Sequence, residues 1–170
     1  MTVNNPFELA SGNGPERTFK VSLSPIERRL TTSAAREVKE LIEAGHPTTI
    51  RLAPPGYSGG GKAEREYQAL VASELRGKHL QALDTLVATS GNDTVPEEIL
   101  HQWLAAVEAV RLTLGTELNI TEDMEDPSQE RLKANPKLAL YLYVTWLQSQ
   151  LVDALFFVLP TKGSAEPGSP

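Results

Sequence analysis

The longest apolar stretch of the chain covers residues 138–159. Seventeen of these 22 residues are apolar or aromatic, and they point in nearly every direction around a helix. Asn135-Pro136 before the stretch is typical of a helix start, and Pro160 ends it. A helix that is apolar all round has to be enclosed by a bundle, by a second subunit or by a membrane.

A membrane is the least favoured of these three surroundings. The stretch is long enough to span a bilayer, but Gln148, Gln150 and Asp153 lie near its middle. A carboxylate is costly at that depth, and no other segment approaches the same length of apolar sequence. We therefore expect the helix to be the central element of a protein bundle or its dimer seam, without a membrane partner.

Three further helices are predicted because apolar positions repeat every three or four residues. They cover residues 25–45, 62–90 and 94–114. Residues 24–27 and 94–97 each match a capping box, with Ser or Thr first and Glu last. Ile26 and Leu30 belong to the apolar face of the first helix and are expected to point to the core.

The region 62–90 has a break in its apolar pattern. The phase of the apolar positions shifts between Leu75 and Leu80, and Gly77 lies between them. Because glycine weakens a helix interior, we expect a kink at this point or two consecutive helices.

The remaining segments predict little regular structure. Residues 18–23 alternate between apolar and polar and indicate a short strand, which could pair with the β-prone residues 48–52 as a two-stranded ribbon. Residues 1–17 and 160–170 are rich in Gly, Pro, Ser and Asn, and are expected to be flexible tails. The predicted fold class is therefore all-α, a single domain over residues 18–159 with four to five helices and a short N-terminal strand.

Charge and composition narrow the function further. The net charge of −6 comes from 22 acidic and 16 basic residues, and six of the acids lie in residues 117–130, which contain no Lys or Arg. The rest of the chain is therefore neutral, and one loop is acidic. Nucleic-acid-binding proteins usually carry a basic surface, which this charge distribution does not indicate. The chain has no cysteine, which excludes disulfides, thiolate metal sites and cysteine nucleophiles. The N-terminal residues do not resemble a signal peptide, so a cytoplasmic location is expected.

Catalytic and metal-binding patterns are not recognisable in the sequence. His46, His79 and His101 are scattered, without partners at helical spacing. The glycines at 59–61 lack the Gly-Lys-Ser/Thr ending of a phosphate loop. We therefore predict no catalytic residues, no metal and no cofactor, and we do not expect an enzyme.

Several side chains are candidates for binding another molecule. Trp103 and Trp146 suit a core, and aromatic residues are also enriched in interfaces. Asp153 is expected to be buried and paired with an arginine such as Arg111, although a buried carboxylate can also be functional through a shifted pKa. With the first-helix arginines, the candidate interaction residues are Trp103, Arg111, Trp146, Asp153, Arg28 and Arg29.

The order and spacing of several short segments resemble an actinobacterial family of unknown function, also labelled AosR-like oxidative-stress transcriptional regulators. The resemblance covers residues 19–158. Its segments are Leu23 to Arg28, Arg51-Leu52 with Pro55 and Tyr57, Glu66-Tyr67, Trp103-Leu104, Arg111 to Thr116, Leu142, Trp146-Leu147-Gln148 and Leu151-Val152.

This resemblance implies a non-enzymatic regulator that acts on transcription through a protein partner such as a sigma factor. It adds no catalytic residues. Together with the aromatic final helix, it leads us to expect a homodimer. A direct DNA-binding regulator, and a helical protein with a small-ligand pocket or an uncharacterised enzyme activity, remain alternatives. Because this chain has no cysteine, it cannot sense oxidants through a thiol of its own.

Overall fold

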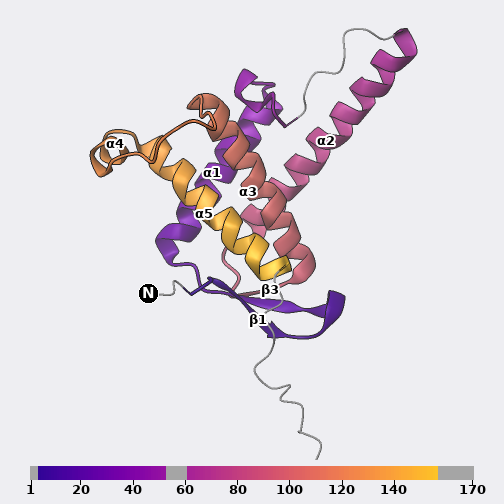
Figure 1. Cartoon of the computed structure of the whole chain (residues 1–170). Coiled ribbons are helices and arrows are strands. Elements are labelled where there is room, and N and C mark those ends of the chain that lie inside the picture. The colour runs from indigo at the N-terminus through magenta and orange to yellow at the C-terminus, as the bar shows by residue number, and fades with distance from the viewer. Residues whose placement is uncertain (1–3, 53–60, 157–170) are drawn as a thin grey trace, which may run out of the picture.

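The protein folds as a bundle of helices that is closed at one end by a small sheet (Figure 1). The structure is a computed structural model, and it describes residues 4–52 and 61–156. The helices are α1 (Pro25–Glu43), α2 (Lys62–Thr89), α3 (Glu97–Glu117), α4 (Gln129–Ala134) and α5 (Pro136–Phe156), with 3-10 turns η1 (Gly14–Glu16) and η2 (Pro47–Thr49). The strands are β1 (Phe7–Ser11), β2 (Thr18–Val21) and β3 (Thr94–Pro96). The predicted all-α bundle with a short N-terminal strand is therefore confirmed.

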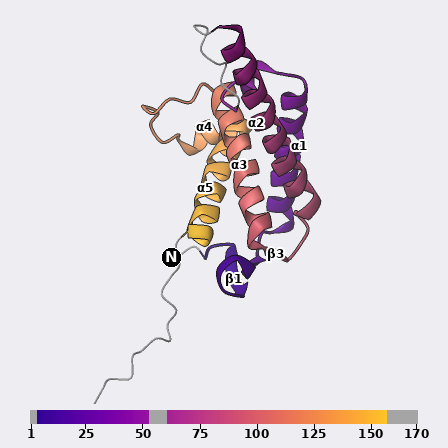
Figure 2. The same ribbon diagram turned by 90° about the vertical axis from the view of Figure 1, so that its right-hand side faces the viewer.

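The centre of the bundle is α3, not the more apolar α5. Helix α3 lies between α5 on one side and α1 and α2 on the other (Figure 2), and it buries Leu100, Trp103, Val107 and Val110. Helix α5 buries only part of its circumference, so it is a side of the bundle with apolar residues left facing outward. None of the helices in the described ranges combines the length and apolar character needed to cross a membrane.

Helix α1 begins as its sequence predicts. The Ser24 hydroxyl accepts a hydrogen bond from the Glu27 backbone N–H (3.2 Å), and the Glu27 carboxylate accepts one from the Ser24 N–H (2.7 Å). This capping box satisfies two N–H groups that the first turn leaves without helical partners. At the other end, Gly45 adopts a φ of +64°, which glycine tolerates and which turns the chain away from the helix.

The sheet is antiparallel, in the order β1-β2-β3, and lies across one end of the bundle. Its inward face packs Phe7, Phe19 and Val95 against the helices, and the Phe7 and Trp103 rings are nearly perpendicular with 6.0 Å between their centroids. The strand predicted within 18–23 is confirmed. The predicted pairing with residues 48–52 is wrong, because residues 47–49 form η2 and β2 pairs with β1 and β3 instead.

The N-terminal boundary also needs correction. Residues 1–17 were expected to be a flexible tail, but β1 and η1 lie within them, and burial of Phe7 anchors the strand. The tail expected over 160–170 lies outside the described residues.

The second predicted capping box, at residues 94–97, is wrong. Residues 94–96 form β3, and the N-cap of α3 makes no side-chain hydrogen bond. The Glu97 carboxylate instead accepts two hydrogen bonds from the Arg17 guanidinium, both of 2.8 Å. These bonds hold the pKa of Glu97 below its usual range. A contact 80 residues away in sequence thus replaces the local cap.

Helix α2 is one continuous helix of 28 residues, so the expected kink or division is wrong. Its first half projects beyond the rest of the bundle (Figure 1), and no residue of α2 before Ala82 is buried. The shift in apolar phase therefore marks a change of environment along a straight helix.

Candidate interaction surface

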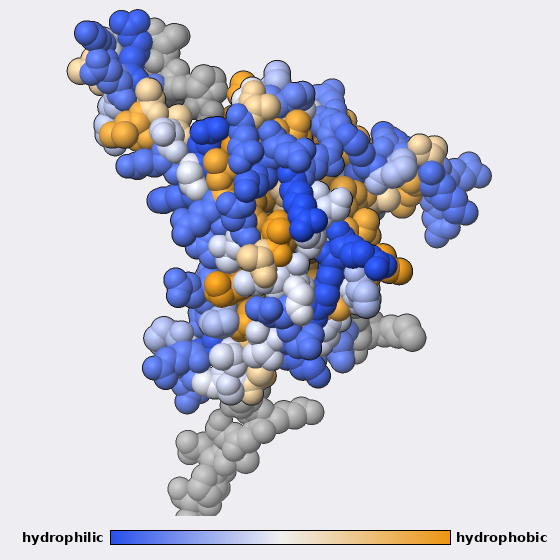
Figure 3. Space-filling model, turned by 180° about the vertical axis from the view of Figure 1, so that it is seen from behind, coloured by the Kyte–Doolittle hydropathy of each residue, from blue (hydrophilic) through white to orange (hydrophobic). Residues whose placement is uncertain are grey.

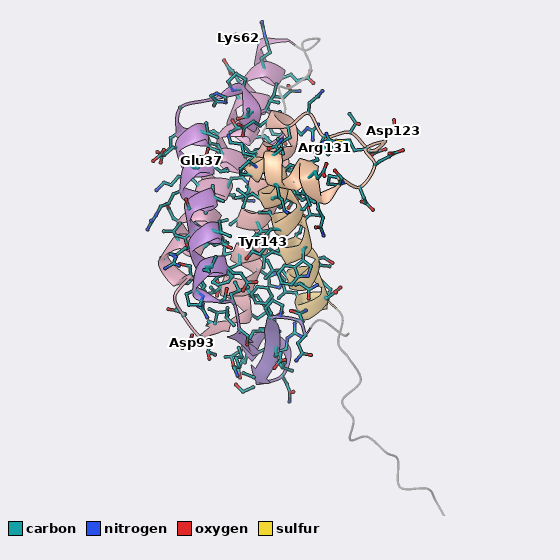
Figure 4. The ribbon with its side chains drawn as sticks, turned by 90° about the vertical axis from the view of Figure 1, so that its left-hand side faces the viewer. Glu37, Lys62, Asp93, Asp123, Arg131 and Tyr143 are labelled. Atoms are coloured by element: carbon teal, nitrogen blue, oxygen red, sulfur yellow. The ribbon has the colours of Figure 1, made fainter. Side chains whose placement is uncertain are left out.

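Exposed apolar side chains lie on both sides of the contact between α1 and α5, with Ile26 and Leu30 on α1 and Leu142 on α5. The two helices meet at Thr31 and Tyr143, whose hydroxyl oxygens are 3.2 Å apart, and Figure 4 looks onto this face. Burial raises the pKa of the Tyr143 phenol, so the side chain stays neutral and hydrogen-bonded. This contact fixes which side chains of each helix lie next to the seam.

The helices run in opposite directions, because α1 leaves the sheet directly after β2 and α5 ends at the sheet, where Arg17 donates to the Leu155 carbonyl. Trp146, three residues beyond Tyr143, therefore lies about level with position 28 of α1, between Ile26 and Leu30 along the helix. The Tyr143 and Trp146 rings pack at 5.9 Å between centroids.

Exposed apolar residues flank this aromatic pair. Ile26 is 62% exposed and Leu30 46% exposed, and Leu142 lies one turn before Trp146. We call Ile26, Leu30, Leu142, Tyr143 and Trp146 the α1–α5 patch. Exposed apolar side chains grouped with aromatic residues are typical of sites that bind another protein.

The sequence found only part of this patch. Trp146 was a candidate, whereas Ile26 and Leu30 were expected in the core and Tyr143 was not singled out. On α1 the core side is formed by Ala35, Val38 and Ile42, and Ile26 and Leu30 lie to one side of that stripe. Only the position of α5 in the structure shows that Ile26 and Leu30 lie beside the contact between the two helices.

Trp103, in contrast, is a core residue and not an interaction residue. It is buried at the centre of the bundle, and its indole N–H donates to the Thr89 hydroxyl at 2.7 Å. The hydrogen bond satisfies the only polar group of a side chain that is otherwise enclosed by apolar neighbours.

The expected burial of Asp153 and its pairing with Arg111 are both wrong. Leu147, Leu151 and Leu155 form the buried side of α5, and Asp153, two residues after Leu151, points away from them into solvent. Within the described residues the two side chains form no ion pair. Arg111 is partly buried on α3, and its Nε has no hydrogen-bond partner there.

Arg28 connects two segments of backbone instead of offering its charge to solvent. Its guanidinium donates to carbonyl oxygens on both sides of the β2–α1 junction and of the α2–β3 turn. These acceptors are Val21 (3.0 Å), Leu23 (3.0 Å), Ser90 (2.8 Å) and Asn92 (2.9 Å), and the Asp93 carboxylate is 3.2 Å away. A guanidinium with its donors used in this way is not free to bind phosphate. Arg29, on the next position, is exposed and makes no hydrogen bond among the described residues.

A hollow of about 430 Å³ lies between the end of α1, η2 and α2. Its polar side chains are bound to nearby groups: His79 contacts the Leu52 carbonyl at 3.2 Å, Arg76 donates to the Glu43 carbonyl at 3.4 Å, and His46 caps η2. They do not converge on one point as a catalytic or ligand-binding set would. In the described ranges no three His, Asp or Glu side chains are grouped to hold a metal ion.

A comparison with protein-family profiles identifies the family of this chain. The profile of the family described as Domain of unknown function (DUF2017) matches residues 5–155, which is nearly all of the structure described above. The chain belongs to the DUF2017 family.

Curated relatives of this DUF2017 chain carry a regulator name. A Mycobacterium leprae protein called "Putative oxidative stress regulator AosR" is 33% identical over 162 residues, covering 78% of this chain and 73% of the relative. The "Oxidative stress regulator AosR" of Mycobacterium tuberculosis H37Rv is 30% identical over 159 residues, covering 76% and 71%. The Mycobacterium bovis protein of the same name has the same identity and coverage. No solved structure matches the chain significantly.

The segments that resemble the family include structural contacts of the DUF2017 fold. The segment 23–28 contains the capping box and Arg28. A side-chain carbon at Gly115 would lie 3.5 Å from the Tyr141 ring and 3.7 Å from the Arg51 guanidinium, so this turn of α3 is closely covered. Of the segments on α5, Leu142 and the segment 146–148 reach the α1–α5 patch.

Proposed function

We propose that this DUF2017 protein is a regulator of the oxidative stress response that acts by binding a protein of the transcription machinery, such as a sigma factor, through the α1–α5 patch. The observation that carries the proposal is the exposed apolar seam with its aromatic pair. The names of the mycobacterial relatives support the regulatory role. A seam between two helices offers a partner helix a groove with ridges of side chains on both sides.

Charge placement favours a protein partner over DNA. Arg28 is held by backbone carbonyls, and the other arginines of α1 share the helix with Glu37, Glu40 and Glu43. A specific DNA-binding helix usually presents a basic face, because phosphate contacts supply much of the affinity.

The oxidative signal has to reach the complex without a thiol of these 170 residues, since none is cysteine. A partner that itself responds to oxidants fits this constraint. The protein would then set how much of that partner is available to RNA polymerase.

A paired substitution tests the patch. Ile26→Glu with Leu142→Glu places two charges on the seam without altering the buried side of either helix. We expect the affinity for the cognate sigma factor, measured with purified proteins by biolayer interferometry, to fall by about tenfold or more. The matched control is Leu9→Glu, a leucine on β1 outside the patch whose exposure (52%) lies between those of Ile26 (62%) and Leu142 (36%).

Circular dichroism of each variant checks that the fold is retained. Equal binding by the double variant and the control would refute the patch as the binding site. Failure of the unsubstituted protein to bind any sigma factor or RNA polymerase subunit would refute the proposed function as a whole.

A further inference from the structure

The projecting half of α2 has an apolar stripe that nothing in the described structure covers. We call residues 62–78 the arm. Tyr67 is 67% exposed and Leu75 is also exposed, and Val71 between them is partly exposed. In Figure 3 the arm stands out from the body, with an apolar area on its side.

The stripe does not continue the core-facing side of the same helix. At about 100° per residue, the mean direction of Tyr67, Val71 and Leu75 is turned by roughly 70° from the mean direction of the buried residues Ala82, Leu83 and Leu86. The stripe therefore misses the bundle. An isolated helix of this length is only marginally stable in water, so covering the stripe would stabilise the arm.

The spacing of the stripe is symmetric. Its members are Glu64, Tyr67, Val71, Leu75 and Lys78, separated by three, four, four and three residues. The order is therefore the same from either end, with Val71 in the middle. Its two ends carry opposite charges, and neither forms an ion pair among the described residues.

We propose that the arm is a dimerisation element that pairs antiparallel with the arm of a second copy, about a two-fold axis at Val71. In that arrangement each Tyr67 packs on Leu75 of the other copy, the two Val71 side chains meet, and each Glu64 faces a Lys78. The apolar centre excludes water and the charged ends fix orientation and register.

Charge complementarity selects a second copy in this orientation. A parallel pair would place Glu64 beside Glu64 and Lys78 beside Lys78, which is repulsive at both ends. The antiparallel pair gives two attractive contacts from the same four side chains. Glu74, at the edge of the stripe, then faces the neutral Gln68.

A charge exchange tests the pairing in the full-length chain. The unsubstituted protein should sediment with twice the 18.5 kDa mass of the chain at high concentration. Glu64→Lys alone and Lys78→Glu alone each create two like-charge contacts and should weaken the dimer by about threefold or more. The double variant, Glu64→Lys with Lys78→Glu, restores opposite charges and should recover the dimer.

Cysteine cross-linking gives a second and independent readout, because the natural chain has no cysteine. Val71→Cys places two thiols at the two-fold axis, and mild oxidation should link the copies through a disulfide. Ala69→Cys, on the opposite side of the arm, is the control and should remain largely unlinked.

Three results would overturn the proposal: a monomer at every concentration, single charge variants that dimerise as well as the double variant, or equal cross-linking at positions 69 and 71. A dimer that is broken by Ile26→Glu with Leu142→Glu, but not by Val71→Glu, would place the seam at α5 instead. The two proposals use different surfaces, so either one can fail without the other.

Discussion

At the scale of single residues, the main finding is how Arg28 is used. An arginine in a helix with other basic residues is easily interpreted as a ligand for DNA. The structure shows four backbone carbonyls and a carboxylate around its guanidinium, which join the β2–α1 junction to the turn before β3. Its role is to connect the sheet with the helices.

Substitution of Arg28 by lysine measures this connection. Lysine keeps the charge but has a single ammonium in place of the planar fork, so it cannot reach carbonyls on both sides. We expect Arg28→Lys to lower the free energy of unfolding by about 1 to 3 kcal/mol, measured by urea denaturation. Arg29→Lys, one position further and exposed, should change it by less than about 0.5 kcal/mol. Equal effects of the two substitutions would contradict the connecting role.

At the scale of helices and strands, local patterns were reliable where local contacts decide the structure. The capping box at Ser24 and Glu27 formed as predicted. The same pattern at Thr94 and Glu97 did not form a capping box. Thr94 pairs with Lys20 of β2 in the sheet, and the Glu97 carboxylate accepts hydrogen bonds from Arg17. Neither contact is visible from neighbouring residues.

The same limit applies to the candidate surface. The apolar excess of α5 could be predicted from its sequence, and Trp146 with it. Which side of α1 meets α5 depends on tertiary packing, so Ile26 and Leu30 could not be separated from the core residues of α1. Asp153 was misplaced for the same reason, since the apolar sequence of α5 does not show which side faces α3.

Gly77 gives a prediction for the α2 helix. It lies in the exposed half of a straight helix, and an added side-chain carbon would meet no atom within 4 Å. Because glycine is unfavourable in a helix interior, we expect Gly77→Ala to stabilise the arm by about 1 kcal/mol. Backbone amides of the arm should then exchange hydrogen roughly fivefold more slowly.

The matched control is Gly45, where an added carbon also meets no atom within 4 Å but the φ angle is +64°. Alanine is strained in this conformation, so Gly45→Ala should lower the free energy of unfolding by about 1 kcal/mol. Faster hydrogen exchange in the arm of Gly77→Ala would contradict this prediction. It would mean that α2 bends at Gly77 and that alanine disturbs the bend.

At the scale of the whole molecule, the small sheet unites parts of the chain that are distant in sequence. Arg17 joins β2 to the start of α3 and to the Leu155 carbonyl of α5, and the Asn5 amide donates to the Gln150 carbonyl at 2.9 Å. The sheet thereby holds one end of α5 in place, and with it the α1–α5 patch. Residues near the N-terminus are therefore part of the framework of the proposed site.

Removal of the Phe7 side chain tests this framework. Phe7 is 2% exposed and packs edge-on against Trp103, so Phe7→Ala leaves a cavity beneath the sheet. We expect the free energy of unfolding to fall by about 3 to 5 kcal/mol, with a shift in tryptophan fluorescence as water gains access to Trp103. Leu9→Ala, two residues further along the same strand and 52% exposed, should cost less than about 0.5 kcal/mol. Because β1 also anchors α5, sigma-factor binding should weaken in Phe7→Ala at temperatures where the protein is still folded. Unchanged stability and binding would mean that the bundle and its patch form without β1, and that the sheet is an accessory to the fold.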